Sequence, residues 1–209
     1  MRGVAERLGV TAMTLYGYVP GKEALVSLMY DAVHAEMPDD HRHPGGWRRG
    51  VKAWADDLME LYLRHPWVLH VSYARPVLGP HEQHAVESVA GILRDTGLDP
   101  GLVRRAVGTL IHVVRGTART IAEARWAAET SGVTEEKWWQ DASTALGAVV
   151  PDFADRFPHT MWLFESADTG AGNDPGGYVD HQARTNLGVG LDVLLDGLEV
   201  AMGASGEHR

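Results

Sequence analysis

Apolar residues recur at spacings of three and four through most of the 209-residue chain, a period that predicts helices. Apolar–polar alternation, which would indicate strands, is slight. The sequence therefore predicts an all-α protein. In chain order, the predicted helices cover residues 2–8, 11–18, 22–37, 47–64, 67–73, 80–94, 100–128, a segment from about 134, and 178–202.

A break in this pattern divides the chain into two predicted domains. Pro38 and the polar stretch 39–46 end the third predicted helix, and we place the boundary there. The prediction is a small head over residues 1–37 and a larger helical body over residues 46–209. A second polar segment, 168–177, is rich in Gly, Asp and Asn and is typical of a mobile loop.

Composition and charge narrow the classes of function. The chain has no cysteine, which excludes disulfides, thiol nucleophiles and cysteine-ligated zinc. No apolar run reaches the roughly 18 residues of a membrane span, and no signal peptide is evident, so we expect a cytoplasmic protein. The net charge of −9 argues against nucleic-acid binding, but residues 1–22 carry a local balance of +2, from three basic and one acidic side chain.

Residues 2–16 have the pattern of a helix-turn-helix. Ala5 supplies the small residue needed where the helices cross, and Gly9 supplies the positive φ that the turn requires. In such a motif the second helix lies in the major groove with its N-terminal side chains at the base edges. Spacing alone fits an ordinary αα-hairpin equally well. The predicted apolar anchors are Val4, Leu8, Val10 and Leu15.

The continuation of the motif favours the DNA-reading interpretation. The run from Leu15 to Leu25, LYGYVPGKEAL, resembles the tetracycline-repressor (TetR) family, where Leu-Tyr-x-His-Val-x-x-Lys-x-x-Leu joins the recognition helix to the connecting helix. The resemblance is specific over residues 1–37 and weaker over the body. It implies a dimeric, ligand-responsive repressor of a palindromic operator on double-stranded DNA.

The resemblance implies DNA-binding roles for seven residues. Arg2 matches a DNA contact at the start of the motif's first helix. Tyr16 matches the aromatic residue that contacts the backbone, and Lys22 matches the phosphate-binding lysine. Tyr18 replaces the usual His, and its phenol can still donate to a phosphate. The base-facing tip of the recognition helix matches Thr11, Ala12 and Met13.

The side chains at this tip predict an operator preference. Ala12 and Met13 cannot form bidentate hydrogen bonds to guanine, but they can contact thymine methyl groups. Arg2 is the one candidate guanine reader. We therefore expect half-sites with thymine under the helix tip and a guanine near Arg2.

The chain also departs from the family pattern. The family has a further helix before this motif, which buries the back of the motif, whereas here Met1 lies almost inside it. A start codon assigned too late, a truncated chain and a loss of DNA binding are the three interpretations. The first two are favoured.

Aromatic and polar side chains of the body are candidates for a small-molecule site. Such sites are apolar cavities with a few polar groups, so we expect a largely apolar effector. A lone Trp or His at helical spacing belongs more often to the core or the surface. The candidates are Trp54, Trp67, His70, Tyr73, His84, His112, Arg115 and Trp162.

The resemblance adds Arg75, because this arginine and the proline after it match a pair near the family's effector site. Tetracycline-binding members also use a His four residues earlier, where this chain has Val71. That difference argues against a magnesium–tetracycline effector, and we expect no cofactor. His41 and His43 lack nearby carboxylates and make a poor metal site, so we expect a solvated loop there.

Helices 100–128 and 178–202 resemble the pair that forms the family's four-helix dimer interface, although their apolar stripes would also serve the subunit's own core. A palindromic operator requires a two-fold dimer. Two other functions remain open. One is an enzyme using His112, His84 and Glu87 for acid–base chemistry, although no catalytic motif supports it. The other is a small-molecule-binding helical protein with a vestigial or truncated head.

Overall fold

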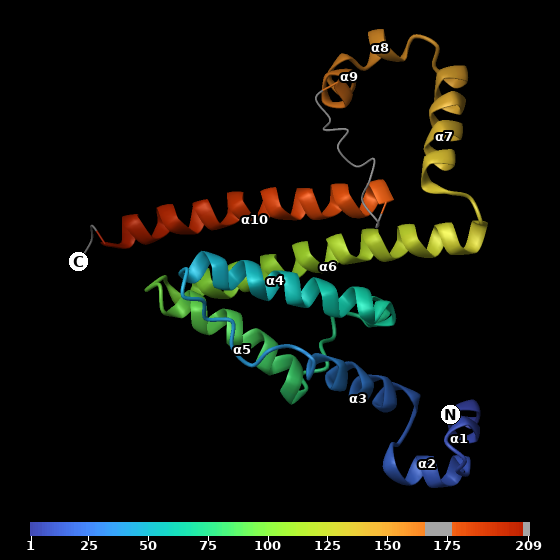
Figure 1. Cartoon of the computed structure of the whole chain (residues 1–209). Helices are drawn as coiled ribbons and strands as arrows, with labels where there is room; N and C mark the ends of the chain where they lie inside the picture. Colours follow the sequence, from blue (N-terminus) through green and yellow to red (C-terminus); the bar gives the residue numbers. More distant parts are fainter. Residues whose placement is uncertain (166–176, 207–209) are drawn as a thin grey trace. The chain divides into compact units, whose positions relative to one another are not determined.

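The computed structural model describes residues 1–165 and 177–206, with side chains to residue 203 (Figure 1). All regular elements in these ranges are helices, which confirms the predicted all-α class. The elements are α1 Arg2–Arg7, α2 Ala12–Tyr18, α3 Lys22–His34, α4 Trp47–Arg64, the 3-10 helix η1 Pro66–His70, α5 Pro80–Arg94, α6 Pro100–Ser131, α7 Glu135–Val149, α8 Phe153–Arg156, α9 Pro158–Glu165 and α10 Gly177–Gly206.

Several helix bounds follow directly from the sequence. The predicted bounds of α4 and α5 are confirmed, and Pro80 occupies the first turn of α5, where its missing N–H costs nothing. Two predictions are wrong. α3 ends at His34 rather than at residue 37, because the next amides bond back three residues instead of four. The predicted helix 67–73 is the shorter 3-10 helix η1, and α8 and α9 were not predicted.

The described chain forms two compact units. The first comprises Met1–Arg115 and the chain from Leu191, and the second comprises the described part of Gly116–Gly190. In the first unit, α5 packs against both α3 and α4. Its core is formed by apolar side chains at helical spacing. They include Val51, Trp54, Leu58 and Leu61 of α4, Val89 and Leu93 of α5, Leu110 and Val114 of α6, and Leu195 of α10.

The segment between α3 and α4 is not the solvated loop that we expected at His41 and His43. His41 is buried, with 5% of its surface exposed. Its Nδ1 shares a 2.7 Å hydrogen bond with the Ser88 hydroxyl on α5, and its Nε2 lies 3.0 Å from an Asp57 carboxylate oxygen on α4. The error arose because the carboxylate partner is sixteen residues away in sequence and adjacent only in the fold. His43 is exposed, as expected.

The second unit is held by the buried carboxylate of Asp180 near the start of α10. Asp180 pairs with Arg125 of α6 and with Arg184 one helical turn further on. The Glu135 carboxylate of α7 accepts a 2.8 Å hydrogen bond from the Val179 N–H. The predicted loop at 168–177 lies outside the described residues, except that Gly177 begins α10.

In the described ranges, no helix combines the length and the apolar character that crossing a bilayer would require.

Candidate nucleic-acid interface and ligand cavity

The N-terminal helices α1 and α2 form the predicted helix-turn-helix. Gly9 has φ of 68°, which confirms the positive φ expected at the turn. The turn is closed by hydrogen bonds from the Gly9 N–H to the Glu6 carbonyl and from the Val10 N–H to the Ala5 carbonyl. A residue with a Cβ would be strained at Gly9, so the sequence determines the angle between the two helices.

The core of this head differs from the predicted set of anchors. Ala5, Leu15 and Val19 are buried together, and Met1, Ala12 and Leu25 pack against them. Three predicted anchors are instead exposed: Val4 by 39%, Leu8 by 63% and Val10 by 41%. The helices meet at the small side chain of Ala5, which brings Leu15 and Val19 inward and leaves the larger residues of α1 outside the contact.

The N-terminal tip of α2 is ordered by its own cap. The Thr11 hydroxyl accepts a 3.1 Å hydrogen bond from the Thr14 N–H, as an N-cap does. It also shares a 2.8 Å bond with the Thr14 hydroxyl. Thr14 is therefore a further polar group at this tip, one that the family pattern did not single out. Beside them, Met13 is 79% exposed and Ala12 is half-buried.

The remaining candidate DNA contacts are available to a partner. Arg2, Tyr16, Tyr18 and Lys22 are all exposed, and Tyr18 is 84% exposed. Lys22 is the first residue of α3 and follows the turn after α2. Exposed basic and phenolic side chains can donate to phosphate oxygens. The head thus presents polar and apolar groups at the N-terminal tip of α2. Side chains that can donate hydrogen bonds lie both before and after this tip in the sequence.

Helix α3 connects this head to a cavity in the same unit. Near its N-terminus, Leu25 packs on the head core. Tyr30 and His34, about one and a half and two and a half turns later, line the cavity. A helix is a stiff element, with about 1.5 Å of rise per residue. One continuous helix therefore contributes to both the head core and the cavity wall.

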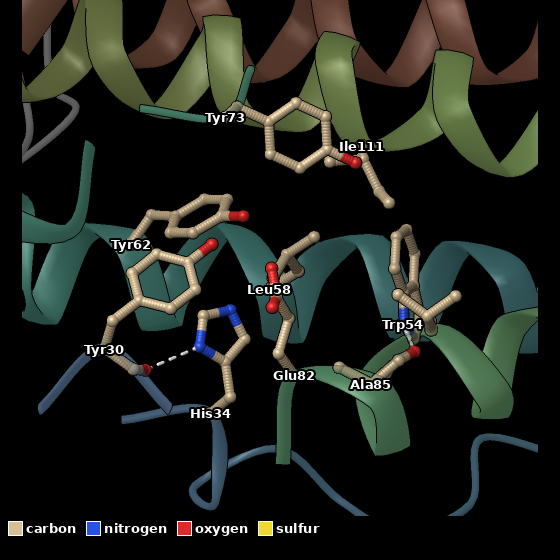
Figure 2. Close-up of a pocket in the computed structure, with 10 residues that line it drawn as sticks. Tyr30, His34, Trp54, Leu58, Tyr62, Tyr73, Glu82, Ala85 and Ile111 are labelled. Atoms are coloured by element: carbon tan, nitrogen blue, oxygen red, sulfur yellow. Dashed lines mark hydrogen bonds between the residues drawn. The ribbon is translucent and has the colours of Figure 1, made fainter. Parts of the chain in front are cut away.

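The cavity is lined by residues of α3, α4, α5, α6 and the segment after η1 (Figure 2). Its volume is about 30 Å³, which is room for one or two water molecules and far below a typical ligand site. A ligand must therefore enlarge it. The lining residues are Tyr30, His34, Trp54, Leu58, Tyr62, Tyr73, Glu82, Ala85, Val86 and Ile111.

Burial favours the neutral form of three phenols and one imidazole in this wall. It raises the pKa of Tyr30, Tyr62 and Tyr73 above the ordinary phenol value. It lowers the pKa of His34 below 6.5. His34 Nδ1 donates a 2.8 Å hydrogen bond to the Tyr30 carbonyl. The phenols and the imidazole are thus neutral near pH 7.

Two buried carboxylates join the start of α5 to its neighbours. Asp31 of α3 accepts hydrogen bonds through Oδ1 from the N–H groups of His81 and Glu82, both at 2.9 Å. Glu82 accepts a 2.6 Å bond from the Leu78 N–H. Asp31 therefore caps a helix on which it does not lie, and it ties α3 to α5 beside the cavity. Figure 2 shows the Glu82 carboxylate pointing into the cavity.

Arg115 of α6 lies beside the cavity without being part of its wall. Its Nη2 donates to the carbonyls of Val68, Leu69 and Val71 at 2.7–3.2 Å. Its guanidinium carbon lies 5.5 Å from the ring centre of Tyr62. Its Nη1 is buried without a hydrogen-bond partner. This side chain thus anchors η1 to α6.

The predicted effector residues are only partly brought together. Trp54 and Tyr73 line the cavity, and the Trp54 Nε1–H donates a 2.7 Å bond to the Ala85 carbonyl. His112 is exposed and meets the Tyr73 ring edge-on. Trp67 is half-buried. The exposed candidates outside the wall are His70, Arg75, His84 and Trp162, the last of which belongs to the second unit.

Tyr30, His34 and Glu82 were missed as lining residues. Tyr30 and His34 lie on the helix assigned to the head, and they are four residues apart, as two side chains on one helical face are. Glu82 looks like an ordinary acidic residue of a first helical turn. In the described ranges, no group of three His, Asp or Glu side chains is arranged to hold a metal ion.

Sequence comparison relates the chain to known regulators. Residues 38–202 match the family described as "Tetracyclin repressor-like, C-terminal domain". The chain is 39% identical over 203 residues to the HTH-type transcriptional repressor DrrR1 of Streptomyces coeruleorubidus, covering 96% of this chain and 69% of that protein. It is 28% identical over 158 residues to an HTH-type transcriptional regulator of Saccharopolyspora erythraea, covering 76% of this chain and 66% of that protein.

Structural comparison gives the same fold. The TetR family protein ActR of Streptomyces coelicolor in complex with actinorhodin superposes with a TM-score of 0.71 at 23% identity, covering 97% of this chain and 88% of that chain. Apo ActR gives a TM-score of 0.68 at 23% identity, with coverage of 97% and 87%. At this identity the similarity is one of fold.

Proposed function

This chain belongs to the tetracycline-repressor family of ligand-responsive transcriptional repressors, and we propose that its α2 reads an operator which the protein releases when a small molecule fills the cavity. The ligand-bound state of ActR supports a small-molecule effector for this chain as well. As a regulator that acts on DNA, the protein would work in the cytoplasm.

The observation that carries the proposal is the course of α3. One uninterrupted helix contributes Leu25 to the head core and Tyr30 and His34 to the cavity wall. Asp31, on the same helix, caps α5. A ligand that enlarges the cavity must move α3 or α5, and movement of α3 reaches α2 through Leu25.

DNA recognition is assigned to the exposed residues of the head. Thr11, Ala12 and Met13 would contact bases at the tip of α2, with Arg2 reading a guanine. The phosphate contacts would come from Tyr16, Tyr18 and Lys22. Because base contacts specify and phosphate contacts position, the two groups should differ in their mutational effects.

Release follows from unequal affinity of the ligand for two states. The cavity of about 30 Å³ describes a closed state without room for an effector. A ligand binds the expanded state only, and it shifts the population toward that state by its differential affinity. The expanded state would hold α2 in an orientation that no longer fits the major groove.

We further propose a homodimer formed through α6 and α10, within residues 100–128 and 178–202. On α10, Val189 and Val193 are 60% and 68% exposed, and a Cβ added at Gly188 or Gly190 would meet nothing within 4 Å. This surface would allow a partner helix to approach closely.

The predicted division into a head over residues 1–37 and a body over residues 46–209 is also part of what we propose.

Selection of binding sites from random duplex DNA, followed by fluorescence anisotropy, tests DNA reading. We expect a palindromic site with thymine and guanine in each half. Lys22→Ala should weaken all sequences alike and reduce the salt dependence by about one unit of slope, whereas Arg2→Ala should relax the guanine preference. Lys137→Ala on α7 is the matched control.

Failure to select any DNA sequence would contradict the proposed reading of an operator by α2. A guanine preference that persists in Arg2→Ala would contradict the role of Arg2 alone. Sedimentation showing only monomer at micromolar concentration would contradict the dimer.

A further inference from the structure

The cavity contains one acidic side chain in a wall that is otherwise aromatic or aliphatic. Glu82 is only 7% exposed, yet it lines the cavity together with Trp54 and Tyr62. No Lys, Arg or Asp is among the lining residues. An acidic group in this position is unfavourable unless it finds a partner, because burying a charge without compensation destabilises the protein.

The known contacts of Glu82 leave part of its carboxylate available. One oxygen, Oε2, accepts the Leu78 N–H at 2.6 Å. In the part of the chain that the structure describes, no cationic side chain forms an ion pair with it. His34 cannot serve as that cation, because burial lowers its pKa and keeps the imidazole neutral. Figure 2 shows the carboxylate among the labelled side chains that line the cavity.

The surrounding rings complete the environment that organic cations favour. Tyr30, Trp54, Tyr62 and Tyr73 all line the cavity. Aromatic faces attract cations, and aromatic cages bind quaternary ammonium groups in this way. The three phenols stay protonated because burial raises their pKa. They therefore add no negative charge to the wall. Tyr62 and Tyr73 already meet the Arg115 guanidinium, whose carbon lies 5.5 and 6.0 Å from their ring centres, so among the described residues Tyr30 and Trp54 are the lining rings without a cationic partner.

We propose that the effector is an organic cation, with an apolar body among the rings and an ammonium group paired with Glu82. This inference deepens the proposed function, since it rests on the cavity being the effector site. The opposite class, an organic anion, would need Arg115. That side chain is outside the wall and is held against η1, where its Nη2 donates to the backbone carbonyls of Val68, Leu69 and Val71. Its Nη1 is buried without a hydrogen-bond partner, so tightest binding of an anionic probe is the outcome that would assign the site to this guanidinium instead.

Three probes with one aromatic body test the charge preference. Isothermal titration of the full chain at pH 7.4 would use 1-naphthylmethylammonium, the neutral 1-naphthylmethanol and the anionic 1-naphthoate. The cost of enlarging the cavity is similar for all three, so it cancels in the comparison. We expect the ammonium probe to bind at least tenfold more tightly than the alcohol, and naphthoate to bind most weakly.

Matched variants then locate the effect. Glu82→Gln keeps an acceptor for the Leu78 N–H but removes the charge, and it should reduce the preference to about twofold or less. Glu87→Gln, an exposed position on the same helix, should keep the full preference. Tyr73→Leu should lower ammonium affinity several-fold, whereas Tyr73→Phe, which keeps the ring, should not.

Three results would overturn the proposal: equal binding of the alcohol and the ammonium probe, no binding of the ammonium probe, or tightest binding of naphthoate. The wild-type ranking decides this even if a variant fails to fold. The titration contains no DNA, so it tests the effector class separately from the repressor mechanism. If the cavity prefers the ammonium probe but this probe never releases the protein from its operator, the proposed function is contradicted and the effector class is not. Release from the operator by the alcohol or naphthoate but not by the ammonium probe would contradict the effector class alone.

Discussion

The junction between α3 and α5 depends on one carboxylate, and its removal should be measurable as a loss of stability. Asp31 is 9% exposed and accepts the N–H groups of His81 and Glu82 at 2.9 Å. Losing a helix cap costs about 0.5–2 kcal/mol, and a buried donor left unpaired costs about 1–3 kcal/mol. The bond to the Glu82 N–H is buried and the bond to the His81 N–H is partly buried, so water replaces the Glu82 bond poorly.

Asp31→Ala should therefore lower the free energy of unfolding by about 2–3 kcal/mol, which is a large share of the roughly 5–15 kcal/mol of a typical domain. Asp31→Asn keeps an acceptor and should lose about 1 kcal/mol or less. Urea denaturation followed by circular dichroism measures both. Asp39→Ala, at an exposed position in the following loop, should change little.

A double-mutant cycle with Gly79 makes this prediction sharper. A Cβ at Gly79 would lie 2.2 Å from the Asp31 Cγ. The backbone there has φ of −73°, which alanine adopts freely, so the cost of Gly79→Ala comes from the collision. Gly79→Ala should therefore destabilise the wild type by about 1–3 kcal/mol but cost much less in the Asp31→Ala background. Equal costs in the two backgrounds, or an unchanged urea midpoint for Asp31→Ala, would refute the described junction.

Two further predictions concern buried histidines. Burial lowers the pKa of His34 below its ordinary 6.5, so the unfolded chain binds the proton first as the pH falls. The stability that neutral His34 contributes is complete above about pH 6.5 and is lost as the pH falls below it. Between pH 7.5 and 5.5, the urea midpoint should therefore fall more for the wild type than for His34→Gln. Ser88→Ala removes the 2.7 Å partner of His41 Nδ1 and should cost about 1–2 kcal/mol in the same assay. His43→Ala, at an exposed position, should change the free energy of unfolding very little. Equal losses for Ser88→Ala and His43→Ala would contradict the buried hydrogen bond between Ser88 and His41.

The helices of the first unit were largely predictable because their boundaries are local. Pro66 follows α4, and Pro80 begins α5, so backbone chemistry alone limits both elements. Gly9 similarly determines the turn of the head. α3 ended earlier than its apolar pattern suggested, because the amides from Ala35 to Met37 bond back three residues instead of four, a change that the spacing of apolar side chains does not reveal.

The cavity was less predictable because its polar groups come from separated segments. Trp54 and Tyr73 were expected from residue type, but Glu82 and His34 become lining residues only when α3 and α5 pack together. His41 was misjudged for the same reason. A pattern of apolar residues shows which face of a helix is buried; it does not show which polar side chain is buried with it.

We propose that expansion of the cavity, transmitted by α3, removes the protein from DNA. Ala85→Leu tests it without any effector, since the buried Ala85 lines the cavity of about 30 Å³ and a leucine there would force it open. Gln83→Leu, at an exposed position on the same helix, is the control for added bulk.

The decisive measurement is the Kd for the selected operator, determined by fluorescence anisotropy on variants first shown to be folded by their thermal transitions. We predict that Ala85→Leu binds at least tenfold more weakly than wild type and Gln83→Leu binds equally well. A folded Ala85→Leu that binds the operator with wild-type affinity would contradict the coupling.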